Sequence, residues 1–101
     1  VLRPSGRENK RMLKADAGLI AWHDPARKLL FAKHAAYDPA GNYPLGTNLA
    51  VYIGPKNFMV EMETMGACAT LKPGQVLKHR ETWLLADAKS APTAKELRKL
   101  F

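Results

Sequence analysis

The stretch Asn57-Phe-Met-Val-Glu-Met-Glu-Thr-Met-Gly66 decides the fold of this chain, because its side chains alternate with a period of two. Such alternation is typical of a β-strand whose two faces meet different environments. It sets Glu61 and Glu63 on one face together with Met59 and Met65, and the two acids lie ~7 Å apart at two residues of strand rise. Two acids beside two methionines on one strand face are the first indication of a functional site.

Further strands are predicted before and after this stretch, separated by short turns. The predicted strands cover residues 17–22, 29–33, 47–53, 57–66, 66–71 and 76–85. The first two enclose a polar Asp-Pro turn and predict a β-hairpin, although a helix competes for residues 28–36. Residues 37–46 form a loop on composition, and the turn at residues 72–75 places Pro and then Gly at its middle, which is the type II pattern.

The two ends of the chain have a different character. Residues 1–16 are polar and basic and predict an N-terminal arm that becomes ordered only by docking. Residues 88–101 contain Thr93-Ala-Lys-Glu96, a capping-box pattern, followed by apolar side chains at helical spacing, and predict a linker and a short C-terminal helix. Between them, residues 17–87 predict one all-β domain, a mostly antiparallel β-sandwich, with a small barrel as the alternative.

Composition limits the functions that need to be considered. The 101 residues suit one domain, and 16 basic against 9 acidic side chains give a net charge of +7. Because the excess positive charge lies mainly at the two ends, we interpret it as solvated tails. The single Cys68 cannot form an internal disulfide and indicates a reducing, cytoplasmic location. No segment predicts a membrane span or a signal peptide, and the initial Val1 suggests a processed or truncated product.

Two motifs near the end of the predicted domain resemble a known fold family. Leu71-Lys-Pro-Gly-Gln75, followed by His79-Arg-Glu-Thr-Trp-Leu-Leu85, is similar to the "L-x-P-G-E, then h-x-E-x-W-x-L" ending of proteins with the galactose-mutarotase-like supersandwich. The resemblance extends over residues 17–86 and includes a family of functionally unassigned proteins. Gln75 stands where this family often carries Glu, and Ala50 stands where it often carries an acid. Because the family's domain is far longer, the resemblance implies a C-terminal half-sandwich that another chain or a missing N-terminal half completes.

This resemblance implies a carbohydrate-related function. In aldose 1-epimerases of this fold, a glutamate on a late strand acts as general base on the anomeric hydroxyl, and a histidine protonates the ring oxygen. Glu63 is the residue most similar to that base, with Met59 and Met65 as an apolar wall that favours proton transfer near neutral pH. No histidine matches the acid, and His34 or His79 would need a different geometry. The resemblance therefore implies sugar binding, with epimerase chemistry at Glu63 as its catalytic form.

Other residues are candidates for contact with a sugar. His79, Glu81 and Trp83 share one face of the last predicted strand, and a tryptophan beside polar groups is typical of carbohydrate sites. We add Glu61 from the central strand and Tyr43 from the long loop as substrate-binding candidates. These residues also have purely structural explanations. The two acids of the central strand are equally expected on a solvent-exposed strand face, and a strand tryptophan is equally expected in a hydrophobic core.

The remaining expectations concern partners. Neither a metal nor a cofactor is expected, because the possible ligands are not clustered and Cys68 stands alone. Asp24 and Asp38, each before a proline, are interpreted as turn formers. Strands of an incomplete sandwich leave unpaired edges, so we expect a homo-oligomer, such as a homodimer, formed through Met59, Met65 and the first hairpin. The alternative function is a non-catalytic protein-interaction or nucleic-acid-binding module that acts through its basic ends.

Overall fold

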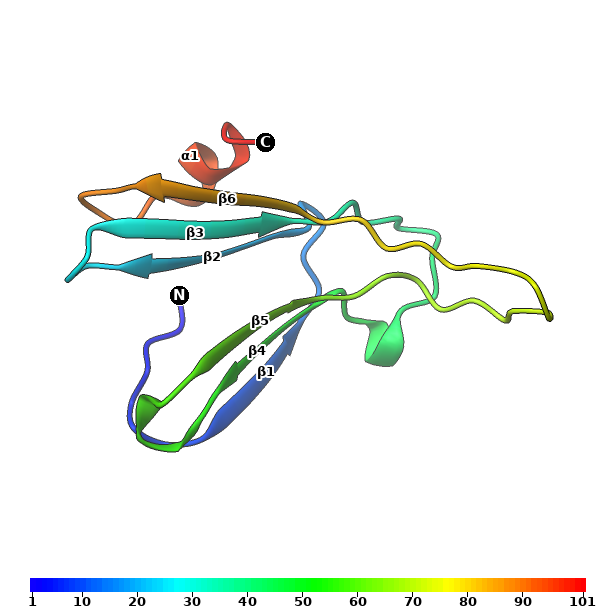
Figure 1. Cartoon of the computed structure of the whole chain (residues 1–101), viewed down its shortest axis with the longest axis horizontal. Helices are drawn as coiled ribbons and strands as arrows, with labels where there is room; N and C mark the ends of the chain where they lie inside the picture. Colours follow the sequence, from blue (N-terminus) through cyan, green and yellow to red (C-terminus); the bar gives the residue numbers. More distant parts are fainter.

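The computed structural model describes residues 1–101 as two three-stranded sheets, one short helix and their connections (Figure 1). Sheet A has the strand order β1-β4-β5 and contains β1 (Asn9–Leu13), β4 (Leu49–Ile53) and β5 (Val60–Thr64). Sheet B has the order β2-β3-β6 and contains β2 (Leu19–Asp24), β3 (Leu29–His34) and β6 (Thr82–Asp87). Every pairing is antiparallel, which confirms the predicted all-β, mostly antiparallel architecture.

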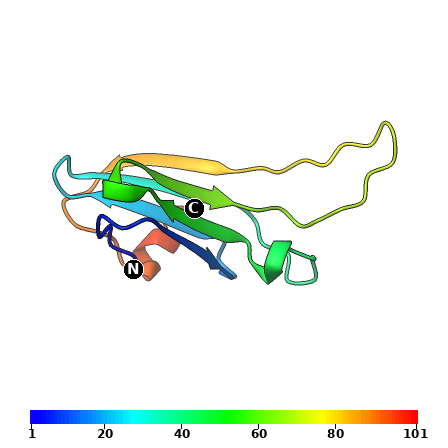
Figure 2. The same cartoon turned by 90° about the horizontal axis from the view of Figure 1, so that it is seen from below.

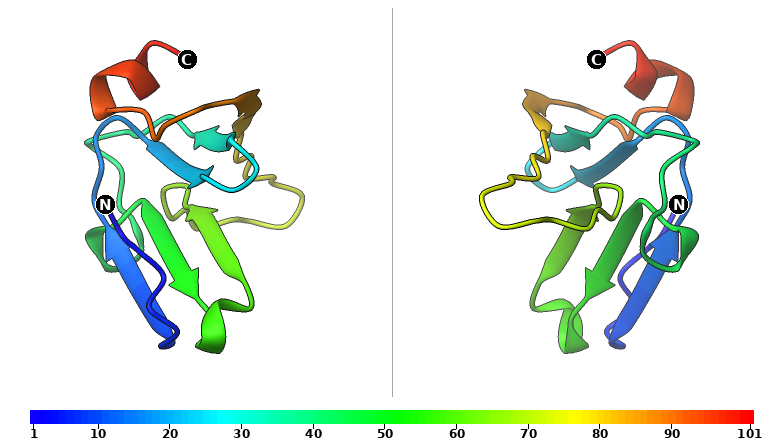
Figure 3. Two further views of the ribbon diagram at one scale, coloured as in Figure 1. Left: turned by 90° about the vertical axis from the view of Figure 1, so that its left-hand side faces the viewer. Right: turned by 90° about the vertical axis from the view of Figure 1, so that its right-hand side faces the viewer.

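The two sheets face each other, approach at one end and diverge toward the other (Figures 1 and 3). We call these the closed end and the open end of the molecule. Only 12 of the 101 residues are buried, and the Cα radius of gyration is 15.1 Å, whereas a compact domain of this length has about 13 Å. The buried apolar residues are Ile20, Leu30, Ala32, Ala35, Tyr43, Leu49, Ala50 and Ile53. The chain therefore has a small core, and few side chains are fully buried.

The β2–β3 hairpin forms as its turn sequence predicts. The Asp24 carboxylate accepts hydrogen bonds from the backbone N–H groups of Ala26 and Arg27, and its second oxygen lies 2.7 Å from the Arg27 guanidinium. These hydrogen bonds give partners to backbone N–H groups of the turn, which have none in the strand pairing, and this is the usual role of an aspartate in a turn. The resulting register sets Trp22 opposite Phe31, so both rings project from the same face of sheet B.

Strand β5 keeps the alternation of the central stretch over a shorter range than predicted. Residues Val60, Met62 and Thr64 face sheet B, whereas Glu61 and Glu63 lie on the outer face of sheet A, opposite Tyr52 and Ala50. The strand begins only at residue 60 because the short 3₁₀ helix η2 (Pro55–Asn57) precedes it. Residues 56 and 57 both have positive φ, a conformation that does not continue a strand.

The structure differs from the prediction at the N-terminus, where residues 9–13 of the expected arm form strand β1. This strand pairs along its whole length with β4. Lys10 reaches across β4 and its Nζ lies 2.9 Å from a carboxylate oxygen of Glu63. Lys10 therefore complements Glu63 on the outer face of sheet A, and part of the N-terminal charge is paired within the sheet.

A second difference concerns residues 65–81, which we call the extended loop. Two strands were predicted over residues 66–71 and 76–85, but only Thr82–Asp87 forms a strand, and the loop projects from the closed end (Figures 1 and 2). The ladders end at the pairs Leu49–Thr64 and His34–Thr82, and no further strand lies beside the loop. Its tip has Gly74 at φ 84° and a bond from Gln75 N–H to the Lys72 carbonyl, so the predicted type II turn is confirmed.

The predicted C-terminal helix is present as α1 (Ala94–Arg98). The Thr93 hydroxyl accepts a bond from the Glu96 N–H, and the Glu96 carboxylate accepts one from the Thr93 N–H, which completes the capping box. The helix lies on the face of sheet B that points away from sheet A (Figure 1). The ring of Phe101 lies 5.5 Å from that of His34, so the end of the chain packs against β3.

Candidate functional site

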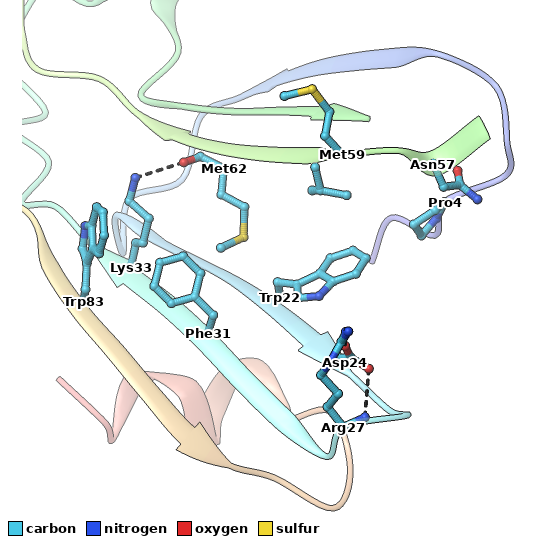
Figure 4. A pocket seen from close by; sticks show the side chains of 11 residues that line it. Pro4, Trp22, Asp24, Arg27, Phe31, Lys33, Asn57, Met59, Met62 and Trp83 are labelled. Atoms are coloured by element: carbon cyan, nitrogen blue, oxygen red, sulfur yellow. Dashed lines mark hydrogen bonds and ion pairs between the residues drawn. The ribbon is translucent and has the colours of Figure 1, made fainter. Parts of the chain in front are cut away.

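A cleft with a volume of about 680 Å³ lies between the two sheets (Figure 4). Sheet B supplies three aromatic rings, Trp22, Phe31 and Trp83, and sheet A supplies Met62 on the opposite side. The volume lies within the range of small-molecule sites, and an apolar lining with a few polar groups is their usual composition. The cleft is thus the best candidate for a binding site in this chain.

A polar cluster lies at the closed end of the cleft and is centred on Glu81. One carboxylate oxygen lies 2.7 Å from Lys33 Nζ and also accepts a hydrogen bond from the Thr64 hydroxyl. The other oxygen accepts a bond of 2.7 Å from the indole N–H of Trp83. Because the Thr64 hydroxyl donates its only proton to Glu81, its 2.7 Å contact with His79 Nε2 requires that His79 is the donor. The cluster therefore joins β3, β5 and β6.

Lys33 is the buried cation of this cluster, and its residue is only 8% exposed. Its ammonium group donates to the Met62 carbonyl at 3.0 Å and lies 5.3 Å from the centre of the Trp83 ring. A buried ammonium is tolerated only when its charge and its donors are satisfied, which Glu81, the carbonyl and the ring accomplish together. The indole of Trp83 is held by its hydrogen bond to Glu81, by the ammonium group of Lys33 and by an edge-on contact with Phe31 at 5.6 Å.

The surroundings of Glu81 determine its protonation. Partial burial disfavours the charged carboxylate, but hydrogen bonds from Lys33, Thr64 and Trp83 and the positive charge of Lys33 outweigh this effect and lower its pKa from 4.5 to about 2. Glu81 is therefore ionised at neutral pH. A carboxylate with so low a pKa and both oxygens occupied is a poor general base, so the cluster orients side chains rather than transferring protons.

A second ion pair lies at the open end of the cleft, where Asp24 and Arg27 form part of its lining. Hydrogen bonds from the backbone and the side chain of Arg27 lower the pKa of Asp24, so this carboxylate is also ionised. Pro4 and Asn57 border the cleft near this end (Figure 4). Polar groups thus occupy both ends of a cleft whose middle is aromatic.

The structure brings together three of the six residues that the sequence indicated. His79, Glu81 and Trp83 belong to the polar cluster. Glu61 and Glu63 lie on the outer face of sheet A, where Glu63 pairs with Lys10, and neither lines the cleft. Tyr43 is buried: its hydroxyl accepts the Asp38 N–H at 2.9 Å and its ring lies 5.0 Å from that of Tyr37, so it anchors the loop that contains it.

Several residues of the cleft were not indicated by the sequence analysis, chiefly Trp22, Lys33 and the Asp24–Arg27 pair. The alternation of β3 contained a signal for Lys33, because a period of two places it on the same face as Phe31. For Trp22, the only signal was its position two residues before the turn aspartate. Both signals become informative only when the facing sheet is known.

Comparisons of the chain with protein-family models, with curated proteins and with solved structures give no match. No three His, Cys, Asp or Glu side chains gather in the arrangement that a metal ion needs. None of the helices has the length and apolar character required to cross a membrane. The cleft itself is therefore the feature of this chain that indicates a function.

Proposed function

We propose that this chain binds a neutral saccharide in the cleft between its two sheets. The observation that carries the proposal is the combination of the Trp22 and Phe31 rings with an ion pair at each end of the same cleft. A pyranose ring has an apolar face of C–H groups, which an aromatic ring can cover. Its hydroxyl groups both donate and accept hydrogen bonds, which paired carboxylates, cations and amides satisfy.

The charges of the cleft favour a ligand without net charge. Lys33 is neutralised by Glu81, and Arg27 is neutralised by Asp24. An anionic ligand would have to compete with these carboxylates for the two cations, and a cationic ligand would have to compete with Lys33 and Arg27 for the two carboxylates. Hydroxyl groups can instead add to both pairs without separating them.

The proposal concerns binding, and epimerase chemistry at Glu63 is a separate hypothesis with its own test. Glu63 is engaged with Lys10 on the outer face, away from the cleft. If Glu63 acts as the base, the wild-type chain accelerates the optical rotation change of freshly dissolved galactose and Glu63→Gln loses this acceleration. If the cleft only binds, both proteins leave the rate at that of buffer.

Binding itself is testable by the fluorescence of the two tryptophans, both of which line the cleft. We expect saturable changes on titration with galactose, glucose or short oligosaccharides at millimolar concentrations. Trp22→Ala should weaken binding about tenfold, because one lost aromatic contact corresponds to ~1 kcal/mol or slightly more. Circular dichroism must show that the variant keeps its sheet content.

Glu63→Gln is the matched control, since it changes a side chain outside the cleft and should keep wild-type affinity. Salt separates the proposal from the alternative of a nucleic-acid-binding module: sugar binding should be nearly independent of salt, whereas phosphate binding weakens steeply as salt rises. Absence of saturable binding for all the sugars, or equal affinity in Trp22→Ala and the wild type, would refute the proposal.

A further inference from the structure

The extended loop contains a long segment of chain whose backbone has few partners. From Cys68 to Arg80 every residue is exposed. The only backbone bonds in this range are those from Cys68 N–H to the Asn42 carbonyl and from Gln75 N–H to the Lys72 carbonyl. Residues 76–80 therefore lie outside helix and strand with unpaired N–H and C=O groups, which are then free to accept a neighbouring strand.

This segment continues directly into β6, which is itself an edge strand of sheet B. Figure 3 shows that β5 and β6, the edges of the two sheets, lie on the same side of the molecule and lead into the extended loop. The exposed apolar side chains continue along this edge, with Val76 76%, Trp83 65% and Leu85 71% exposed. Residues 76–85 thus form one unpaired edge with apolar side chains along it, the form of surface to which extended peptides add as a strand.

The charge of the loop selects the partner. Between Met65 and Arg80 there is no acidic residue, whereas Lys72, Lys78 and Arg80 are positive. A second copy of this chain paired along the same edge would set like charges against each other, and each copy has a net charge of +7. A strand with acidic side chains at alternate positions would instead meet opposite charges.

We propose that the edge formed by residues 76–85 binds an extended acidic polypeptide segment, which adds to sheet B as a further strand beside β6. Backbone hydrogen bonds to residues 76–80 provide the affinity, and Lys78 and Arg80 select acidic side chains. A nucleic acid would use the same charges but not the backbone groups, so the polypeptide makes fuller use of this edge. This edge shares only Trp83 with the lining of the cleft. The residues substituted in its test, Leu77, Lys78 and Arg80, do not line the cleft, so the test is independent of sugar binding.

The probe is a fluorescently labelled peptide, acetyl-(Val-Glu)₄-amide, with acetyl-(Val-Lys)₄-amide as its charge-reversed counterpart. Fluorescence anisotropy should show binding of the acidic peptide only, weakened as salt rises. Lys78→Glu/Arg80→Glu should weaken it at least tenfold. The matched control, Lys95→Glu/Lys99→Glu, makes the same change in net charge on and after helix α1 and should retain most of the affinity.

Leu77→Pro tests the backbone contribution, because proline removes one N–H and prevents strand pairing there. We expect it to weaken binding of the acidic peptide although all charges remain. The proposal is overturned if the acidic peptide does not bind, if both charge-reversal variants lose affinity equally, or if Leu77→Pro binds like the wild type. It is also overturned if a single-stranded oligonucleotide binds more tightly, or if sedimentation velocity shows a dimer that Lys78→Glu/Arg80→Glu abolishes.

Discussion

The ion pair between Lys33 and Glu81 should be a principal source of stability at the closed end, and Glu81→Gln tests it. Glutamine keeps the shape of the side chain but removes its charge, and its single carbonyl oxygen can accept either from Lys33 and Thr64 or from the indole of Trp83, not from both sides. In either orientation Lys33 would keep only uncharged partners, among them the Met62 carbonyl and the Trp83 ring. A nearly buried ammonium would therefore lose its counter-ion, which is a costly change.

Two routes give the same magnitude for this loss. The pKa of Glu81 falls from 4.5 to about 2 on folding, and at ~1.4 kcal/mol per pH unit this displacement amounts to about 3 kcal/mol. Removal of one partner from a fully buried ion pair costs ~3–5 kcal/mol, and the side chains of this pair, 10% and 21% exposed, place it near the lower end of that range. We expect Glu81→Gln to lower the free energy of unfolding at pH 7 by about 3 kcal/mol.

The pH dependence has a definite sign. A folded-state pKa below the unfolded value gives stability that is fully present above pH 4.5 and is lost as the pH falls toward 2. At pH 3, one pH unit above the folded pKa, only about two fifths of this contribution should remain in the wild type. Glu81→Gln lacks the carboxylate and does not lose this contribution as the pH falls. The difference between the two proteins should therefore shrink to about 1 kcal/mol at pH 3. Losses at Asp24 and Glu96, whose pKa values are also lowered, are common to both proteins and cancel.

Urea denaturation followed by tryptophan fluorescence at several pH values between 7 and 3 measures these differences. Glu63→Gln is the control, because the Lys10–Glu63 pair is 50% and 34% exposed and its loss should cost less than about 1 kcal/mol. Parallel curves for the wild type and Glu81→Gln over the whole pH range would show that the reasoning about Glu81 is wrong.

Two further predictions concern the backbone. Gly18 has φ +58°, and a Cβ there would lie 1.9 Å from the Ala35 carbonyl oxygen, so Gly18→Ala should lower the free energy of unfolding by more than about 2 kcal/mol. Gly74→Ala is the control, because Gly74 has φ +84° but open space around it, and it should cost about 1 kcal/mol. Equal urea midpoints for the two variants would contradict the steric argument. Deleting residues 94–101 removes the contact of Phe101 with His34 and should lower the melting temperature by at least about 4 °C. Thr93→Ala removes only the helix cap and should give a smaller decrease, and an unchanged melting curve of the shortened chain would disprove docking of the helix.

The elements that the sequence predicted correctly depend on neighbouring residues. The turn at Asp24, the turn at Gly74 and the capping box at Thr93 each need only bonds within three residues. The alternation of β5 likewise needs only the sequence of one strand. Such patterns lie within a few consecutive residues, so they can be recognised without knowledge of the fold.

The elements that were missed depend on partners far along the chain. The charges of β1 were interpreted as a solvated tail because Glu63, the partner of Lys10, lies 53 residues away. Asn48 is buried and its side chain bonds both backbone groups of Ala15, 33 residues away, which no local pattern indicates. The strands predicted in the extended loop had suitable sequences but no neighbouring strand, and a strand forms only where a ladder partner exists.

The same non-local contacts explain why the two ends of the cleft have different roles, one in stability and one in binding. At the closed end, Lys33, Thr64 and Glu81 tie the two sheets together, so substitutions there change stability first and affect a ligand through Lys33 and Trp83, the members of this cluster that line the cleft. Toward the open end, Trp22 lines the cleft beside an exposed turn and belongs to no such cluster. Loss of binding without loss of stability at Trp22, together with loss of stability at Glu81, would therefore separate the surface that recognises a ligand from the contacts that hold the sheets together.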